Sequence, residues 1–309
     1  MTICVAAMAA KRKAIVMVAD KAITFGKERP MQADLGIDKM LSIGKTGWQA
    51  MVAGDASFAQ EVVDAAVAEI TNEGKPQNAG IPHSLTAMMR CMKDACKKVR
   101  RQWVIDRFIA PRLFNETDPF AGLPDEYVIE LSGSIAQYQI NCSLLVCGFD
   151  SDKKPHIFSV LSPGLAISHD IPGFHAVGIG RDIALGQLYQ YETKDSQRLD
   201  ETMYELFDAK ATAELIQGVG YLWDCSVLIP DLPEPVKMTT KVRDALEGIL
   251  REATCSPYVP SFGSQFDKIP EWKETVRIFA DDLLGIPHQP IKPAKRRPKS
   301  TPQKSKSRP

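Results

Sequence analysis

Two short apolar runs at the start of the chain constrain its fold more than any other feature. Residues 2–7 and 14–20 are almost entirely apolar, and the basic residues Lys11, Arg12 and Lys13 lie between them. Two such runs around a solvated turn are typical of a β-hairpin. Because alternate and intervening positions are equally apolar, both faces of each strand should be covered. The pattern predicts a sheet stacked between other layers.

The order of the remaining segments favours an α+β fold with stacked antiparallel sheets flanked by helical layers. We expect strands, two helices, strands, two helices and a last strand, without the strict strand-helix alternation of a Rossmann fold. The first of these helices follows a capping box at residues 57–60, with Asp55 as the other candidate cap. The other expected strands are residues 39–43, 48–52, 140–149, 155–161, 174–178 and 226–229. The other expected helices are residues 84–108, 181–191, 204–222, 240–253 and 272–284.

Three regions are expected along the chain. Residues 1–230 form the main domain, with a surface insertion at about 110–138, where Pro, Gly, Asn and Asp are frequent and no period is sustained. Residues 231–291 form a partly helical C-terminal extension. Residues 292–309 contain eight basic residues, four prolines and no acidic residue, which predicts a disordered tail. The tail has no interleaved aromatic residues, which favours a solubilising role over nucleic-acid binding.

Composition indicates a cytoplasmic protein without a metal site. No window has the roughly 18 apolar residues of a membrane span, and the chain does not start like a signal peptide. The seven cysteines lie mostly in apolar stretches, which favours free thiols over disulfides. Their spacing does not resemble that of zinc ligands, so we expect no metal and no cofactor. Surface or strand-end roles are expected for the histidines, which are His83, His156, His169, His175 and His288.

Five short motifs resemble one known family. They are TICVAA at residues 2–7, VMVAD at 16–20, DKMLSI at 38–43, AGDA at 53–56 and AVGIGRDIALG at 176–186. Together they resemble the β subunits of proteasomes. They are also similar to bacterial relatives of these subunits, including the peptidase ring of the two-component ATP-dependent protease and small homologues that start with Met-Thr. The resemblance covers about residues 2–70 and 140–229.

The resemblance implies an N-terminal-nucleophile (Ntn) hydrolase with a four-layer αββα sandwich and threonine-type peptidase activity. It places the nucleophile on Thr2, the activating lysine on Lys39, the carboxylate that orients this lysine on Asp20, and the oxyanion-hole amide on Gly54. The relatives work in closed rings, so a homo-oligomeric ring or open assembly that acts on polypeptides or peptides is implied. An ATPase that unfolds substrates is a further possible partner, and this question is left open.

These assignments also have physical reasons. A threonine hydroxyl needs a base to become a good nucleophile, and an N-terminal amine with a pKa of about 7.7–8.0 suits that task. Thr2 supplies both groups once Met1 is removed, and its small side chain favours that removal without a propeptide. Lys39 would stabilise negative charge on the hydroxyl, and Asp20 would be its buried partner. Gly54 lies where a strand leads into a helix, where a backbone amide can bind an oxyanion.

The sequence departs from the family pattern in two places. Ile179 stands where a serine is common, and residues 224–227 (DCSV) replace an aspartate and a serine followed by two glycines. Asp224 is therefore an open candidate for a supporting residue. Two alternative functions also stay open: a catalytically inactive proteasome-like scaffold or assembly protein, and a non-proteolytic Ntn amidohydrolase. A chain that retains Met1 would be inactive.

Overall fold

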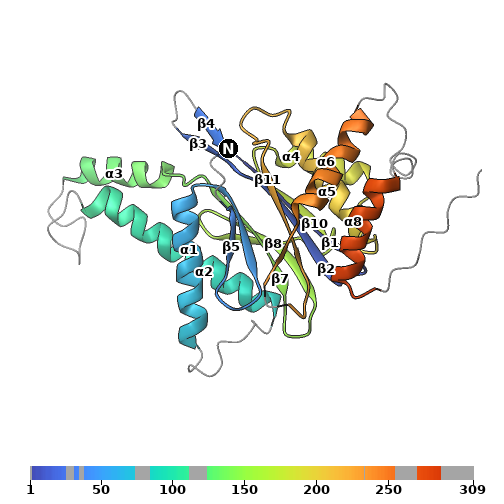
Figure 1. Ribbon diagram of the computed structural model, residues 1–309. Helices are drawn as coiled ribbons and strands as arrows, with labels where there is room; N and C mark the ends of the chain where they lie inside the picture. The colour runs from blue at the N-terminus through green and yellow to red at the C-terminus, as the bar shows by residue number, and fades with distance from the viewer. Residues whose placement is uncertain are drawn as a thin grey trace, which may run out of the picture.

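A computed structural model describes residues 2–25, 31–34, 38–73, 84–110, 124–232, 234–254 and 270–286. Within these ranges the chain forms an α+β fold with two antiparallel five-stranded sheets, one two-stranded sheet and seven α-helices. The two large sheets lie at the centre of the molecule, with helices on both sides (Figure 1). The predicted class and the pair of antiparallel sheets are thus confirmed.

The first large sheet contains the start of the chain and has the strand order β10-β1-β2-β11-β12. Its strands are β1 (Ile3–Ala9), β2 (Ala14–Asp20), β10 (Phe174–Gly178), β11 (Trp223–Leu228) and β12 (Val236–Lys237). The predicted β1–β2 hairpin is confirmed, and its register pairs Cys4 with Ala19. On the other side of β1, Ile3 lies opposite Gly178 of β10. The first residues of the chain are therefore held between two strands.

The second large sheet has the order β5-β6-β7-β8-β9, and all its neighbours are antiparallel. Its strands are β5 (Met40–Ser42), β6 (Gln49–Gly54), β7 (Cys142–Phe149), β8 (Pro155–Leu161) and β9 (Leu165–Ser168). Strand β9 was not predicted from the sequence. It has only four residues and is mostly exposed, so its short apolar stretch at residues 165–167 does not stand out from the turns around it.

Alternate residues of β1 enter two different hydrophobic clusters, which explains why this strand is apolar throughout. Ile3 and Val5 belong to a cluster shared with helix α5 (Leu199–Ala213). Cys4 and Met8 belong to a cluster that also contains residues of the second sheet. Because side chains alternate between the faces of a strand, one face of the first sheet packs on helices and the other on the second sheet.

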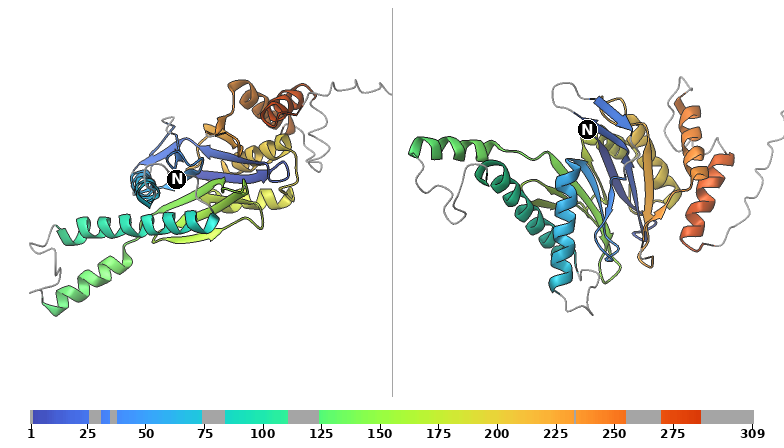
Figure 2. Two further views of the ribbon diagram at one scale, coloured as in Figure 1. Left: turned by 90° about the horizontal axis from the view of Figure 1, so that it is seen from below. Right: turned by 60° about the vertical axis from the view of Figure 1, so that its left-hand side comes forward.

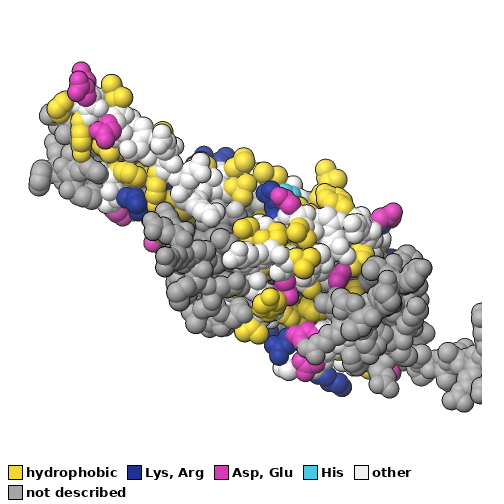
Figure 3. Space-filling view, turned by 90° about the horizontal axis from the view of Figure 1, so that it is seen from above, with side chains coloured by type: hydrophobic (Ala, Val, Ile, Leu, Met, Phe, Trp, Pro, Cys, Tyr) yellow, Lys and Arg dark blue, Asp and Glu magenta, His cyan; other side chains and the backbone are white. Residues whose placement is uncertain are grey.

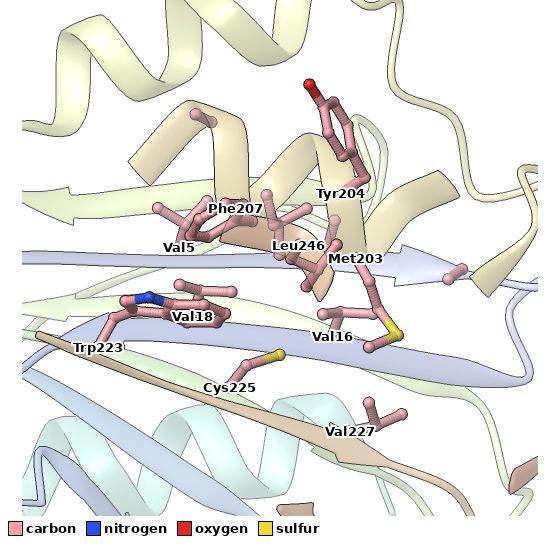
Figure 4. Packing of buried hydrophobic residues seen from close by; sticks show 14 of the residues in the cluster. Val5, Val16, Val18, Met203, Tyr204, Phe207, Trp223, Cys225, Val227 and Leu246 are labelled. Atoms are coloured by element: carbon pink, nitrogen blue, oxygen red, sulfur yellow. The ribbon is translucent and has the colours of Figure 1, made fainter. Parts of the chain in front are cut away.

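Helices cover the outer face of each sheet (Figure 2). Helices α1 (Ala56–Glu73) and α2 (Leu85–Val104) share a cluster with the second sheet. On the first sheet, Figure 4 shows Met203 and Phe207 of α5 lying over the strands, with Leu246 beside them. Leu246 belongs to α6 (Thr240–Thr254), and the outer cluster also receives residues of α8 (Pro270–Leu283). The helices of the C-terminal extension therefore pack onto the same hydrophobic core as α4 (Arg181–Gln190) and α5.

Several predicted boundaries need correction. The capping box at residues 57–60 is wrong: α1 starts at Ala56, and Asp55 caps it by accepting a bond of 3.0 Å from the N–H of Phe58. The helix expected at 204–222 starts and ends earlier, as α5, because residues beyond Ala213 form turns that lead to Gly220. The helix expected at 84–108 is α2 followed by the π-helical turn η1 (Ile105–Ile109).

The insertion expected at 110–138 contains a helix that the sequence analysis missed, α3 (Asp125–Gln137). A second omission is the hairpin of β3 (Ala22–Phe25) and β4 (Met31–Asp34), which occupies the long spacing between Asp20 and Lys39. The predicted disordered tail at 292–309 lies outside the described residues. None of the helices in the described ranges is long and apolar enough to cross a bilayer.

Candidate active site

The side chains of Thr2, Asp20 and Lys39 meet at one end of the first sheet. The Lys39 ammonium donates a hydrogen bond to the hydroxyl oxygen of Thr2, and this hydroxyl donates to Oδ1 of Asp20. Lys39 Nζ also lies 2.7 Å from the same Asp20 oxygen. Three residues that are far apart in the sequence thus form a closed triangle of charge-assisted contacts.

Asp20 connects this triangle to the backbone. It is the last residue of β2 and is 1% exposed. Besides the two side chains, Oδ1 accepts a bond of 3.1 Å from the N–H of Ile3, and Oδ2 accepts one of 2.8 Å from the N–H of Gly220. A buried carboxylate needs several donors to offset its lost hydration. With four donors, Asp20 is fixed in one orientation.

Lys39 reaches Thr2 from the second sheet. It lies immediately before β5, and its carbonyl accepts a bond of 3.0 Å from the N–H of Val52. Its side chain is only 9% exposed, and its ion pair with Asp20 spans the space between the two sheets. An ammonium with so little water around it is held in place by its two partners. Its position therefore depends on the packing of one sheet against the other.

The backbone of Thr2 is fixed by the edge strand β10. The Thr2 carbonyl accepts a bond of 2.9 Å from the N–H of Ile179, and Thr2 is 3% exposed. Gly178 has φ +103°, and a Cβ at that position would lie 2.2 Å from the Thr2 carbonyl oxygen. Only glycine allows this close approach. Gly178 is therefore a part of the site that the sequence analysis did not identify as such.

Gly54 occupies the end of β6, where the second sheet leads into α1. It has φ +105°, and a Cβ would lie 1.9 Å from the carbonyl oxygen of Asn141 on the neighbouring chain segment. The following amide, that of Asp55, donates a bond of 2.9 Å to the same carbonyl. This requirement for glycine explains the sharp passage from strand to helix beside Thr2.

A cavity of about 480 Å³ opens at this point, and both Thr2 and Gly54 line it. It is lined by residues of both large sheets and of the β10–α4 connection. Ile179, in the position where proteasome β subunits commonly have a serine, lies on its wall and is 46% exposed. The Thr2 side chain is therefore next to a space that can hold a small part of a ligand.

Asp224, which the sequence analysis left open as a supporting residue, takes part in an ion pair of its own. It lies in β11, and its carboxylate pairs with Lys21 at 2.8 Å. The backbone group that supports Asp20 from this region is instead the N–H of Gly220. Sequence reasoning could not find this contact, because it joins residues 200 positions apart through a main-chain atom.

The cysteine thiols in the described ranges are placed for packing. Six cysteines there are buried and form no disulfide, and burial raises the pKa of the Cys4 and Cys225 thiols. A raised thiol pKa makes these groups poor nucleophiles at neutral pH. Across the described part of the chain, no three or more His, Cys, Asp or Glu residues gather as a metal site would require.

Comparison with known proteins assigns no family: no family model and no curated sequence matches this chain. The chemical arrangement of the site is therefore the main ground on which a function can be proposed.

Proposed function

We propose that this protein is a threonine-type peptidase or amidohydrolase of the Ntn class, whose mature chain begins at Thr2. The observation that carries the proposal is the closed contact of the Thr2 hydroxyl with the ammonium of Lys39 and the carboxylate of Asp20. A buried cation and anion around a threonine hydroxyl are costly to desolvate. They also give that oxygen a strongly polar environment, as an activated nucleophile requires.

The proposed reaction has two steps. The Thr2 hydroxyl oxygen attacks an amide carbonyl carbon, while its proton passes to the α-amine of the same residue. The C–N bond then breaks, the amine gives the proton to the leaving nitrogen, and an ester with Thr2 remains. Water attacks the ester carbonyl carbon and loses a proton to the α-amine. The C–O bond to Thr2 then breaks, the amine returns the proton to the Thr2 oxygen, and the carboxylic acid leaves.

The other residues have separate roles in this scheme. Lys39 stabilises negative charge on the Thr2 oxygen, and Asp20 holds Lys39 in place. The amide of Gly54, on the wall of the same cavity, would bind the oxyanion of the tetrahedral intermediate. Gly178 and Gly220 are positioning residues, since they act on the backbone of Thr2 and on the Asp20 carboxylate.

The layer order supports the finer assignment to the αββα sandwich. Two sheets share one hydrophobic cluster, and each packs on helices at its outer face. This order agrees with the resemblance of residues 2–70 and 140–229 to proteasome β subunits. We extend the proposal to a cytoplasmic, proteasome-like homo-oligomer that acts on peptides or polypeptides, with an unfolding ATPase as an open partner.

Covalent labelling tests the proposal. The purified full-length protein is incubated with a peptide vinyl sulfone, and the labelled residue is located by mass spectrometry. We expect one adduct on Thr2, its loss in Thr2→Ala and its retention in Thr2→Ser, which keeps a hydroxyl. Strongly reduced labelling is expected in Lys39→Met, whereas Lys237→Met, which removes an exposed lysine paired with Asp38, should label normally.

An unlabelled wild-type protein would refute the enzyme and leave the scaffold as the better explanation. Turnover of small amides without turnover of peptides would favour the non-proteolytic amidohydrolase.

A further inference from the structure

The cavity beside Thr2 has an uneven charge. Among the described residues that line it, the ionisable ones are His169, His175 and Arg181, and none is acidic. The neighbouring polar groups on its wall include Ser143 and Ser159, which can donate hydrogen bonds. The groups that can carry charge in this cavity are therefore all cationic when charged. An anionic group is the ligand that this lining complements.

Two of the lining residues are histidines that contact each other. The imidazole rings of His169 and His175 are stacked, with centroids 3.4 Å apart and planes 7° from parallel. His169 follows β9 and its Nε2 lies 2.9 Å from the hydroxyl of Ser159 on β8, while His175 belongs to β10. The pair therefore joins the edges of the two large sheets. In Figure 3, which views the molecule from above, histidine reaches the surface next to basic and acidic side chains.

The surroundings of both rings favour the neutral imidazole. Burial, the neighbouring His169 ring and Arg181 lower the pKa of His175 to about 4. Burial also lowers the pKa of His169, against the opposing effect of Asp170. Asp182, which is outside the cavity lining, pairs with Arg181 at 2.8 Å and is itself exposed. A carboxylate in the cavity would counter the repulsion within this cluster and favour proton uptake by the imidazoles.

We propose that His169, His175 and Arg181 form a subsite that selects substrates with a carboxylate side chain, Glu or Asp, near the amide that Thr2 would attack. The proposal rests on the proposed function for the position of that amide, but the binding of the acidic side chain can be measured without catalysis. A substrate held there by charge-assisted hydrogen bonds would have its neighbouring carbonyl presented to Thr2 and Gly54.

The experiment uses full-length protein carrying Thr2→Ala, so that no covalent step contributes. The probes are hexapeptides of alanine with capped ends, in which one glutamate is moved through the six positions, together with the matched glutamine and lysine peptides. Affinity is measured by calorimetry at pH 6.5. We expect one glutamate position to bind at least about tenfold more tightly than its glutamine partner, and the lysine peptide to bind most weakly.

Variants identify the groups responsible. His169→Gln with His175→Gln, and separately Arg181→Gln, should remove most of the preference for glutamate. Arg101→Gln, which removes an exposed arginine on α2, should keep it. NMR of the imidazoles provides a second readout that a purely structural role would not change: the glutamate peptide should raise the pKa of both rings, and the glutamine peptide should not.

Equal affinity for glutamate and glutamine peptides at every position would overturn the subsite, and so would a preference that persists in the double histidine variant. These results are separate from those of the labelling test. Glutamate preference without labelling of Thr2 refutes only the enzyme, and labelling of Thr2 without glutamate preference refutes only the subsite.

Discussion

The ion pair between Asp20 and Lys39 should be one of the strongest local determinants of stability. The two charged groups are 2.7 Å apart, and their side chains are 0% and 9% exposed. At an effective dielectric constant of about 20, the gross attraction is about 6 kcal/mol, from which desolvation subtracts several kcal/mol. Asp20→Ala leaves a buried ammonium with only the Thr2 hydroxyl as its partner. We therefore expect the free energy of unfolding to fall by about 3–5 kcal/mol.

Lys39→Met should cost less, because Asp20 keeps the Thr2 hydroxyl and the N–H groups of Ile3 and Gly220. The double variant should lose no more than Asp20→Ala alone, so the coupling energy should at least equal the loss in Lys39→Met, which we expect to be about 2–3 kcal/mol. Urea unfolding followed by circular dichroism measures all four proteins. Additive losses, with no coupling between the two positions, would show that the two charges do not depend on each other and would refute this reasoning.

Two further predictions test other parts of the account. Gly178→Ala should lower the free energy of unfolding by at least about 2 kcal/mol and abolish labelling of Thr2, because its Cβ would meet the Thr2 carbonyl. Gly186→Ala is the control, because its Cβ has nothing within 4 Å, and it should keep the wild-type stability and the labelling of Thr2. Burial raises the pKa of Glu205 from 4.5 to about 7, so the folded protein holds a proton that the unfolded chain releases in this range. The free energy of unfolding should therefore fall by up to about 3 kcal/mol as pH rises from about 4.5 to 7. Thermal unfolding of Glu205→Gln should show a weaker dependence on pH. The same pH dependence in the variant and the wild type would contradict the raised pKa of Glu205.

Much of the first sheet could be predicted because local patterns determine it. The runs at 2–7 and 14–20 are apolar at almost every position, and the structure explains this by the packing of both faces of the sheet. Strand β8 and strand β10 have the predicted bounds, since short apolar runs there end at polar turns. Strands β3, β4 and β9 have only four residues each, which is too short for a strand pattern to stand out, and they were missed.

The site could be predicted only in part. The sequence motifs predicted that Thr2, Asp20 and Lys39 act together, and the structure brings these side chains into contact. The backbone contribution of Gly220 and the stacking of His169 on His175 depend on how distant strands align. A single sequence contains no local signal for such contacts, and the histidines were accordingly expected in surface or strand-end roles.

The central claim is that one residue supplies both an amine and a hydroxyl to the reaction. Intact-mass measurement of the purified protein, followed by tandem mass spectrometry after incubation with a peptide electrophile, tests it most directly. We predict a mature chain that starts with Thr2 and gains the mass of one inhibitor on that residue. A protein that still carries Met1, or an adduct on any other residue, would contradict the proposed mechanism.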